Sequence, residues 1–138
     1  MKKKSFAKKF AVSAMAVLMA ATLLTGCGGD SNESSSGEEF VIGGIGPTTG
    51  SAATYGENVK NGAELAVKEI NEAGGINGVP IRFEWQDDEN DAEKSVNAYN
   101  SLKDKGIQIL MGTVTSQPCA AVVAETSSDN MFQLTPSG

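Results

Sequence analysis

The chain has 138 residues, of which 11 are Lys or Arg, 17 are Asp or Glu and none is His, so its formal net charge is −6. Five of the basic residues precede Cys27, which leaves a charge of −11 on the remainder. Such an acidic surface repels nucleic-acid phosphates and anionic lipids. Without histidine the chain lacks the commonest general base and metal ligand, so we expect no enzyme, metal site or cofactor.

The N-terminus has the features of a secretory signal. Five lysines precede an apolar stretch over residues 10–24, which is shorter than the ~20 residues that a membrane span needs. Residues 24–27, Leu-Thr-Gly-Cys, resemble a lipobox, in which Cys27 becomes the diacylated N-terminus. Two acyl chains anchor a protein stably. We therefore predict a signal peptide over residues 1–26 and a lipid-anchored protein on the extracytoplasmic face of the cell membrane.

If Cys27 carries lipid, Cys119 has no disulfide partner, and without a neighbouring base we expect Cys119 to be a small buried hydrophobic residue.

The segment after Cys27 is predicted to be a tether. Residues 28–39 consist only of Gly, Asp, Ser, Asn and Glu, which cannot bury apolar surface. We predict that residues 27–39, starting at the lipidated Cys27, are flexible.

Strand and helix patterns alternate from residue 40 onward. Residues 40–45 form an apolar run rich in Val and Ile, which fits a strand buried on both faces. After a loop over residues 46–54, apolar residues recur with helical spacing as far as Gly74. Apolar residues then alternate with polar ones from Ile81 to Gln86, as in a strand with one wetter face.

The alternation continues to the last residues. Asn90, with a glutamate three residues later, predicts the start of a second helix. Residues 107–111 form another apolar strand. Ser116 is a good N-cap for a third helix that ends at about Asp129, and residues 131–134 begin a fourth strand.

This order predicts an α/β fold with a parallel sheet, βαβαβαβ in sequence, and right-handed crossovers. The 99 residues from Phe40 onward can bury one modest core. A doubly wound sheet normally continues past a fourth strand. We therefore expect residues 40–138 to be the incomplete N-terminal lobe of a larger domain.

Ligand sites in such sheets lie at the carboxyl ends of the strands, and two of the loops there lack the motifs they suggest. The first has Thr49 where a dinucleotide fingerprint needs Gly, and Ser51 where a P-loop needs Lys. The acidic loop over residues 87–91 has Ala92 and Ala98 where an EF-hand needs Gly and Glu. We expect a tight glycine turn and a solvated acidic turn that caps a helix.

The loop before the third helix is the best candidate site. Ser116 at a helix start presents a hydroxyl beside unpaired backbone N–H groups, at the positive end of the helix dipole. These groups suit a carboxylate, although an N-cap with no ligand explains the same residue.

The chain resembles the N-terminal lobe of the leucine/isoleucine/valine-binding proteins, which are the periplasmic-type substrate-binding subunits of branched-chain amino acid ABC transporters. The resemblance covers nearly all of residues 40–138. Its motifs are Gly46-Pro47 to Gly50, Tyr55-Gly56, Asn61-Gly62-Ala63, Ala66-Val67 to Ile70-Asn71, Ala73 to Gly78, Asp87-Asp88, Gly112 and Thr135-Pro136-Ser137.

The resemblance implies a two-lobed protein that closes on an amino acid and delivers it to a permease. It places Tyr55 against the ligand side chain and Val114 and Thr115 in the wall. Ser116 would bind the carboxylate, and the Ser137 carbonyl would accept from the ammonium group. Thr115 departs from the cysteine that some relatives carry. Half of the site is expected to lie outside this chain, so we expect the chain alone to bind weakly or not at all.

Two alternatives belong to other functional classes. A sensor domain of the same fold would bind amides or other small acids. A secreted enzyme on a similar sheet would need a nucleophile and base, which a chain without histidine does not readily supply.

Overall fold

The computed structural model describes residues 37–137. The predicted signal peptide and the lipidation site, Cys27, lie outside the described residues.

Strands and helices alternate along the chain, and the strands form one parallel sheet. The elements are β1 (Phe40–Gly46), α2 (Ala53–Glu72), β2 (Ile81–Asp87), α3 (Ala92–Asp104), β3 (Ile109–Met111), α4 (Ser116–Asp129) and β4 (Phe132–Leu134). These strands all pair in parallel, and their order in the sheet is β2-β1-β3-β4. The predicted fold class is therefore confirmed.

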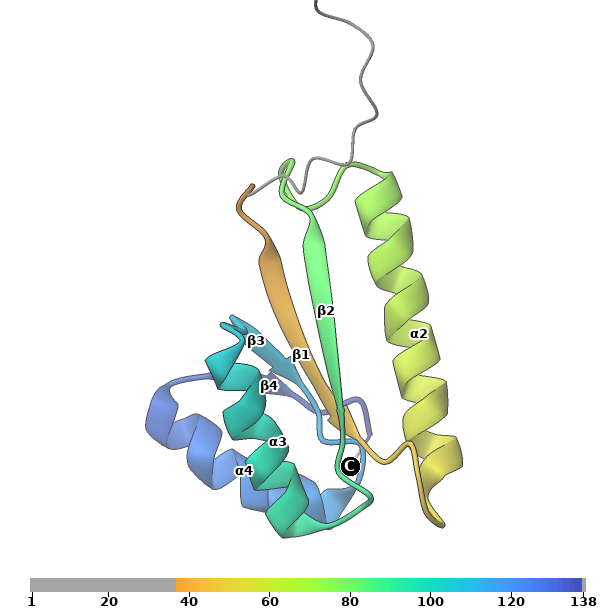
Figure 1. Ribbon diagram of the computed structural model, residues 1–138, viewed down its shortest axis with the longest axis vertical. Helices are drawn as coiled ribbons and strands as arrows, with labels where there is room; N and C mark the ends of the chain where they lie inside the picture. Colours follow the sequence, from red (N-terminus) through yellow and green to blue (C-terminus); the bar gives the residue numbers. More distant parts are fainter. Residues whose placement is uncertain (1–36, 138) are drawn as a thin grey trace, which may run out of the picture. The chain divides into compact units, whose positions relative to one another are not determined.

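The strand order explains where the helices lie. The chain passes from β1 to β2 in one direction and from β2 to β3 in the other, past β1. Crossovers between parallel strands are right-handed, and β3 leads to β4 in the same direction as β2 leads to β3, so α2 lies on one face of the sheet and α3 and α4 lie on the other. Figure 1 shows this arrangement, with α3 and α4 side by side.

The main core lies between the sheet and the α3–α4 layer. Its buried members include Ile45, Tyr99, Leu102, Leu110 and Val122. On the α2 face, the rings of Phe83 and Trp85 pack against each other with centroids 6.0 Å apart. They lie over Gly44, where an added Cβ would come within 2.5 Å of the Trp85 ring. Glycine in β1 therefore makes room for large side chains of the neighbouring strand.

The observed boundaries differ from the predicted ones at several ends. β1 includes Gly46, and α2 begins at Ala53, inside the predicted loop. The cap of α3 is Asp91, whose side chain accepts from Lys94 N at 2.9 Å. The prediction of Asn90 was wrong because this residue has φ = 61°, in the left-handed region.

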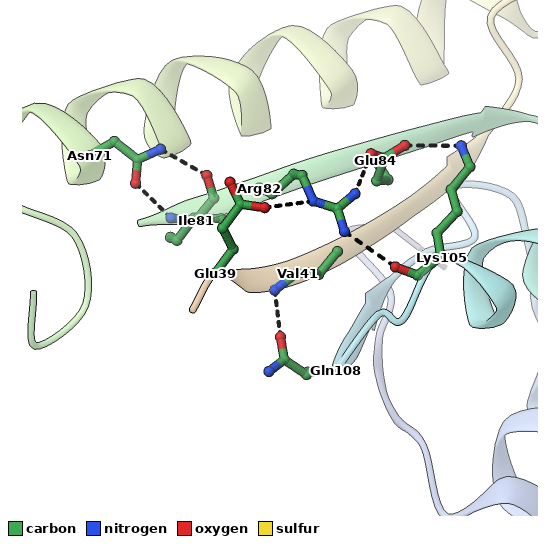
Figure 2. A network of polar contacts seen from close by, with 8 residues as sticks. All are labelled: Glu39, Val41, Asn71, Ile81, Arg82, Glu84, Lys105 and Gln108. Atoms are coloured by element: carbon green, nitrogen blue, oxygen red, sulfur yellow. Dashed lines mark hydrogen bonds and ion pairs between the residues drawn. The ribbon is translucent and has the colours of Figure 1, made fainter. Parts of the chain in front are cut away.

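The third strand is shorter than predicted, since β3 begins at Ile109. Gln108 nevertheless extends the ladder. Its amide N–H donates to Val41 O at 2.8 Å, and its side-chain oxygen accepts from Val41 N (Figure 2).

Charged side chains cover part of the edge strand β2 (Figure 2). Arg82 pairs with Glu39 at 2.9 Å and with Glu84 at 2.5 Å, and Lys105 pairs with Glu84 at 2.9 Å. The hydrogen bond from Lys105, together with that from Arg82, lowers the pKa of Glu84 despite partial burial. Charges on an edge strand disfavour pairing with another chain. Glu39, at the end of the predicted tether, thus contacts the folded part.

Asn71 on α2 fixes the start of β2. Its Nδ2 donates to Ile81 O at 2.8 Å, and its Oδ1 accepts from Ile81 N at 2.7 Å (Figure 2). The side chain thereby satisfies both backbone groups of a buried residue on an edge strand.

We predict that Asn71→Ala lowers the free energy of unfolding by about 1–3 kcal/mol, because it leaves two backbone groups of Ile81 without partners. Urea titration of the full-length protein measures this value. Glu72→Ala is the control, since its ion pair with Lys68 is exposed and contributes less than about 1 kcal/mol. Equal losses in the two variants would contradict the role of Asn71.

Candidate ligand-binding site

The candidate site lies at the carboxyl ends of β1 and β3. These strands are neighbours, with Gly44 paired to Met111, and the direction of the connections reverses between them. Open α/β sheets bind ligands at such a switch point. The loops that leave it are the β1–α2 loop (residues 47–52) and the β3–α4 loop (residues 112–115).

The β3–α4 loop is tied to β4 and to the segment that follows it. Backbone and side-chain groups of the two segments form four hydrogen bonds: Gly112 N to Leu134 O (2.8 Å), Gln133 Nε2 to Gly112 O (2.7 Å), Thr135 Oγ1 to Thr113 O (2.8 Å) and Ser137 Oγ to Val114 O (2.6 Å). These bonds bring Ser137 beside Val114, two residues that are predicted to share the site.

The N-terminus of α4 differs from the prediction. Thr115, with φ = −116° and ψ = 149°, is the N-cap, and its side chain makes no capping hydrogen bond. The first helical bond runs from Cys119 N to Thr115 O at 3.0 Å. Ser116 is thus the first residue of the helix, and its predicted role as N-cap was wrong. Its side chain is exposed.

This geometry leaves backbone N–H donors without acceptors at the start of α4. The first amides of a helix have no intrahelical acceptor, and Thr115 supplies none from its side chain. The amides of Ser116 and Gln117 therefore lie at the positive end of the dipole, next to the exposed Ser116 hydroxyl. Pro118, which has no N–H, is tolerated in the same turn. Together these groups can bind a carboxylate.

The other predicted site residues lie at the same edge in different environments. Val114 is 3% exposed and packs on Gly46, where an added Cβ would be 2.4 Å from its Cγ2. The side chain of Val114 is therefore not accessible to a ligand, which could contact only its backbone. Thr135 Oγ1 lies 2.7 Å from the Ser137 carbonyl oxygen and 2.8 Å from that of Thr113, so its single proton is shared between them and the Ser137 carbonyl retains a lone pair. Tyr55, in the first turn of α2, is 70% exposed. Their roles in binding stay predictions.

Asp87 is an important residue of this edge to which the sequence analysis assigned only a place in a solvated acidic turn. Its carboxylate accepts from Thr48 N at 2.8 Å, Thr49 Oγ1 at 2.7 Å and Glu89 N at 2.9 Å. Burial alone would raise the pKa of Asp87, but these hydrogen bonds outweigh it and lower the pKa. Because Asp87 pairs with Gly46 in the sheet, its side chain can reach the β1–α2 loop.

Asp88 has the opposite environment. It is fully buried and accepts from Asn90 N at 2.9 Å and from Ser95 Oγ at 2.8 Å. Burial raises its pKa above the ordinary 3.8, and the nearby Asp87 charge adds to that effect. The prediction of a solvated acidic turn is therefore wrong for Asp88, which is a buried structural residue.

The β1–α2 loop also packs closely against its own helix. Pro47 is fully buried, and a Cβ added at Gly56 would lie 1.8 Å from the Pro47 carbonyl oxygen. Only glycine allows the start of α2 to approach the Pro47 carbonyl this closely. The position of Tyr55, the preceding residue, is therefore coupled to the loop.

Other features of residues 37–137 lie away from this edge. Cys119 is partly rather than fully buried, and with Val123 and Phe132 it lines a hollow along α4 and β4. Within the described range, no group of three His, Cys, Asp or Glu residues is placed to hold a metal ion. No helix in that range has the length and apolar character of a membrane span.

Comparison with known proteins identifies the family. Residues 39–138 match the family model described as periplasmic binding protein. The chain belongs to this family. A Leu/Ile/Val-binding protein of Rhizobium johnstonii is 39% identical over 98 residues, which are 71% of this chain and 27% of the relative. A Pseudomonas aeruginosa protein named for binding leucine, isoleucine, valine, threonine and alanine is 32% identical over 67% of this chain and 25% of its own length.

Solved structures agree with this assignment. The substrate-binding protein LivJ of a branched-chain amino acid transporter from Streptococcus pneumoniae, in complex with isoleucine, is 32% identical with a TM-score of 0.69. The match covers 72% of this chain and 29% of that one. A substrate-binding periplasmic protein from Ralstonia solanacearum is 26% identical, with a TM-score of 0.67, over 71% and 29% of the two chains. This chain thus spans about a quarter of the length of its relatives.

We predict that Asp88→Asn is tolerated at pH 7 and that Asp88→Ala lowers the free energy of unfolding by about 2 kcal/mol. The Asn side chain can accept from Asn90 N and donate to Ser95 Oγ, whose single proton can then be donated to Asp91 O, 2.9 Å away. Alanine leaves Asn90 N without that acceptor.

The pH dependence follows from the raised pKa of Asp88. Between 3.8 and the higher folded-state pKa, the folded protein binds more protons than the unfolded one, so stability falls as pH rises. Asp88→Asn should remove this contribution, as urea titrations from pH 4 to 7 would show. Equal destabilisation by Asn and Ala at pH 7 would mean that the ionised carboxylate is required.

We also predict opposite effects for two glycines of α2. Gly56→Ala should lower the free energy of unfolding by about 1–3 kcal/mol, because its Cβ forces the helix away from Pro47. Gly62→Ala, with no atom within 4 Å of the added Cβ, should raise it by about 0.5–1 kcal/mol. Urea titration of both variants checks this pair, and a neutral Gly56→Ala would disprove the close contact.

Proposed function

We propose that the protein is the extracytoplasmic solute-binding subunit of an ABC transporter and captures a small amino acid of the branched-chain type. The observation that carries this proposal is the N-terminus of α4, where Thr115 makes no capping hydrogen bond and the Ser116 hydroxyl is exposed. The matches to a protein solved with isoleucine and to one named for binding Leu, Ile and Val support this class of ligand.

The described residues can supply half of such a site. The Ser116 hydroxyl and the amides of Ser116 and Gln117 would donate to the ligand carboxylate. Hydrogen bonds to charged groups contribute roughly 1.5–3 kcal/mol each, so a few orient the ligand without a basic side chain. The Ser137 carbonyl would accept from the ammonium group, and the exposed Tyr55 ring would contact the ligand side chain. The remaining contacts would come from the rest of the protein.

The location and partner belong to the same proposal. Residues 24–27 support lipidation of Cys27, and residues 27–39 would hold the binding domain near the outer surface of the cell membrane. The closed protein would deliver its amino acid to the permease subunits. No part of this role requires the protein to act as an enzyme or to hold a cofactor.

Isothermal titration of the complete protein, which includes the half of the site that we expect to lie outside this chain, with a panel of amino acids tests the proposal. We expect heat with Leu, Ile or Val, and little with Asp or Lys. Absence of heat with every amino acid would refute the amino acid proposal. Heat only with amides or other small acids would favour the sensor interpretation.

We predict that Ser116→Ala weakens binding of the best amino acid about ten- to a hundred-fold, because one hydrogen bond to the carboxylate is lost. Titration calorimetry measures the change. Ser128→Ala is the control, since Ser128 is also exposed on α4 but lies in its last turn. An unchanged affinity in Ser116→Ala would rule out Ser116 as a ligand residue.

A further inference from the structure

We propose that Asp87 is a positioning residue for ligand binding. Its carboxylate holds the β1–α2 loop, and with it the first turn of α2 that carries Tyr55, in the geometry that the site requires. Asp87 itself is not proposed to touch the ligand. This inference rests on the proposed function and adds a residue from a strand that contributes no predicted ligand contact.

The contacts of Asp87 converge from two segments. One carboxylate oxygen, Oδ1, accepts from Thr48 N at 2.8 Å and from Glu89 N at 2.9 Å. The other, Oδ2, accepts from Thr49 Oγ1 at 2.7 Å. Two of the three donors therefore belong to the β1–α2 loop, 38 and 39 residues away in sequence. Hydrogen bonds to an ionised acceptor are stronger than neutral ones, so this carboxylate restrains the loop effectively.

The restraint can be followed from the loop to α2. On its helix side, the loop meets Gly56 through the Pro47 carbonyl. At its end, Ala53 N donates to Gly50 O at 3.3 Å, which joins the loop to the first turn of the helix. A shift of Thr48 and Thr49 would therefore move the backbone on which Tyr55 lies.

The position of Asp87 in the fold indicates a role beyond stability. The main core lies between the sheet and the α3–α4 layer, whereas Asp87 ends β2 at the edge of the candidate site. Thr49 and Gly50 are exposed, so the bonded loop borders solvent rather than the core. We expect loss of the carboxylate to free the loop while the sheet stays folded.

The experiment combines affinity with local exchange in the full-length protein. The ligand is whichever of Leu, Ile or Val gives heat with the wild type. We expect Asp87→Ala to weaken its binding at least tenfold. Asp87→Asn should restore affinity to within about threefold, because its side-chain oxygen still accepts from Thr48 and Glu89. Thr49→Val, which changes only an exposed side chain, should weaken binding about threefold and serves if Asp87→Ala does not fold.

Hydrogen exchange followed by mass spectrometry supplies a readout of the loop itself. Amides of residues 48–56 should exchange faster in Asp87→Ala than in the wild type, and the change should be reversed in Asp87→Asn. The matched control is Asp129→Asn, since Asp129 accepts from Tyr99 OH at 2.9 Å and pairs with Lys103, but lies at the far end of α4. It should leave both affinity and loop exchange unchanged.

The outcomes separate this inference from the proposed function. No heat with the wild type would refute the proposed function and the binding role of Asp87 with it. Normal wild-type binding with unchanged affinity in folded Asp87→Ala and Thr49→Val would refute the positioning role alone. Weaker binding with unchanged exchange of residues 48–56 would also overturn it, because the effect would not pass through the loop.

Discussion

The glycines of β1 are the constraint on which the rest of the structure depends. β1 pairs with both β2 and β3, and large side chains from its neighbours lie across it. A Cβ at Gly44 would come within 2.5 Å of Trp85, and one at Gly46 within 2.4 Å of Val114. Because β1 carries no side chain there, Trp85 and Val114 can pack against it. The loops after β1, β2 and β3 then meet at one edge, where the candidate site lies.

Two adjacent carboxylates show how this edge divides its polar residues between roles. Asp87 keeps a lowered pKa because donors from the β1–α2 loop outweigh its burial, whereas burial dominates at Asp88 and raises its pKa. Asp87 joins two loops, while Asp88 fixes the turn before α3 through Asn90 and Ser95. Asp87 thus joins segments that are far apart in sequence, whereas Asp88, the next residue, stabilises a local turn.

The sequence predicts the order of elements well and the details of the site less well. Helical and alternating apolar patterns are local, so residues 40–45 and the helix up to Gly74 are predicted almost to their ends. The N-cap of α3 is harder to predict, because Asn90 and Asp91 both have side chains that can cap a helix. Which of the two is the cap depends on a turn in which Asn90 N donates to Asp88. Contacts of Asp87 with Thr48 and Thr49 depend on strand register, which no local pattern encodes. Whether Val114 exposes its side chain depends in the same way on Gly46.

A site built from neutral donors needs those donors to be held in place. The segments at this edge, residues 47–56, 112–117 and 135–137, contain no Lys or Arg. A carboxylate would therefore be bound by amides, a hydroxyl and a helix dipole, whose strength depends on their orientation before the ligand arrives. The bonds from Ser137 to Val114 and from Thr135 to Thr113 fix the β3–α4 loop, and those to Asp87 fix the β1–α2 loop. Since the bonds to Asp87 hold a loop that borders solvent, they can determine affinity with little influence on the fold.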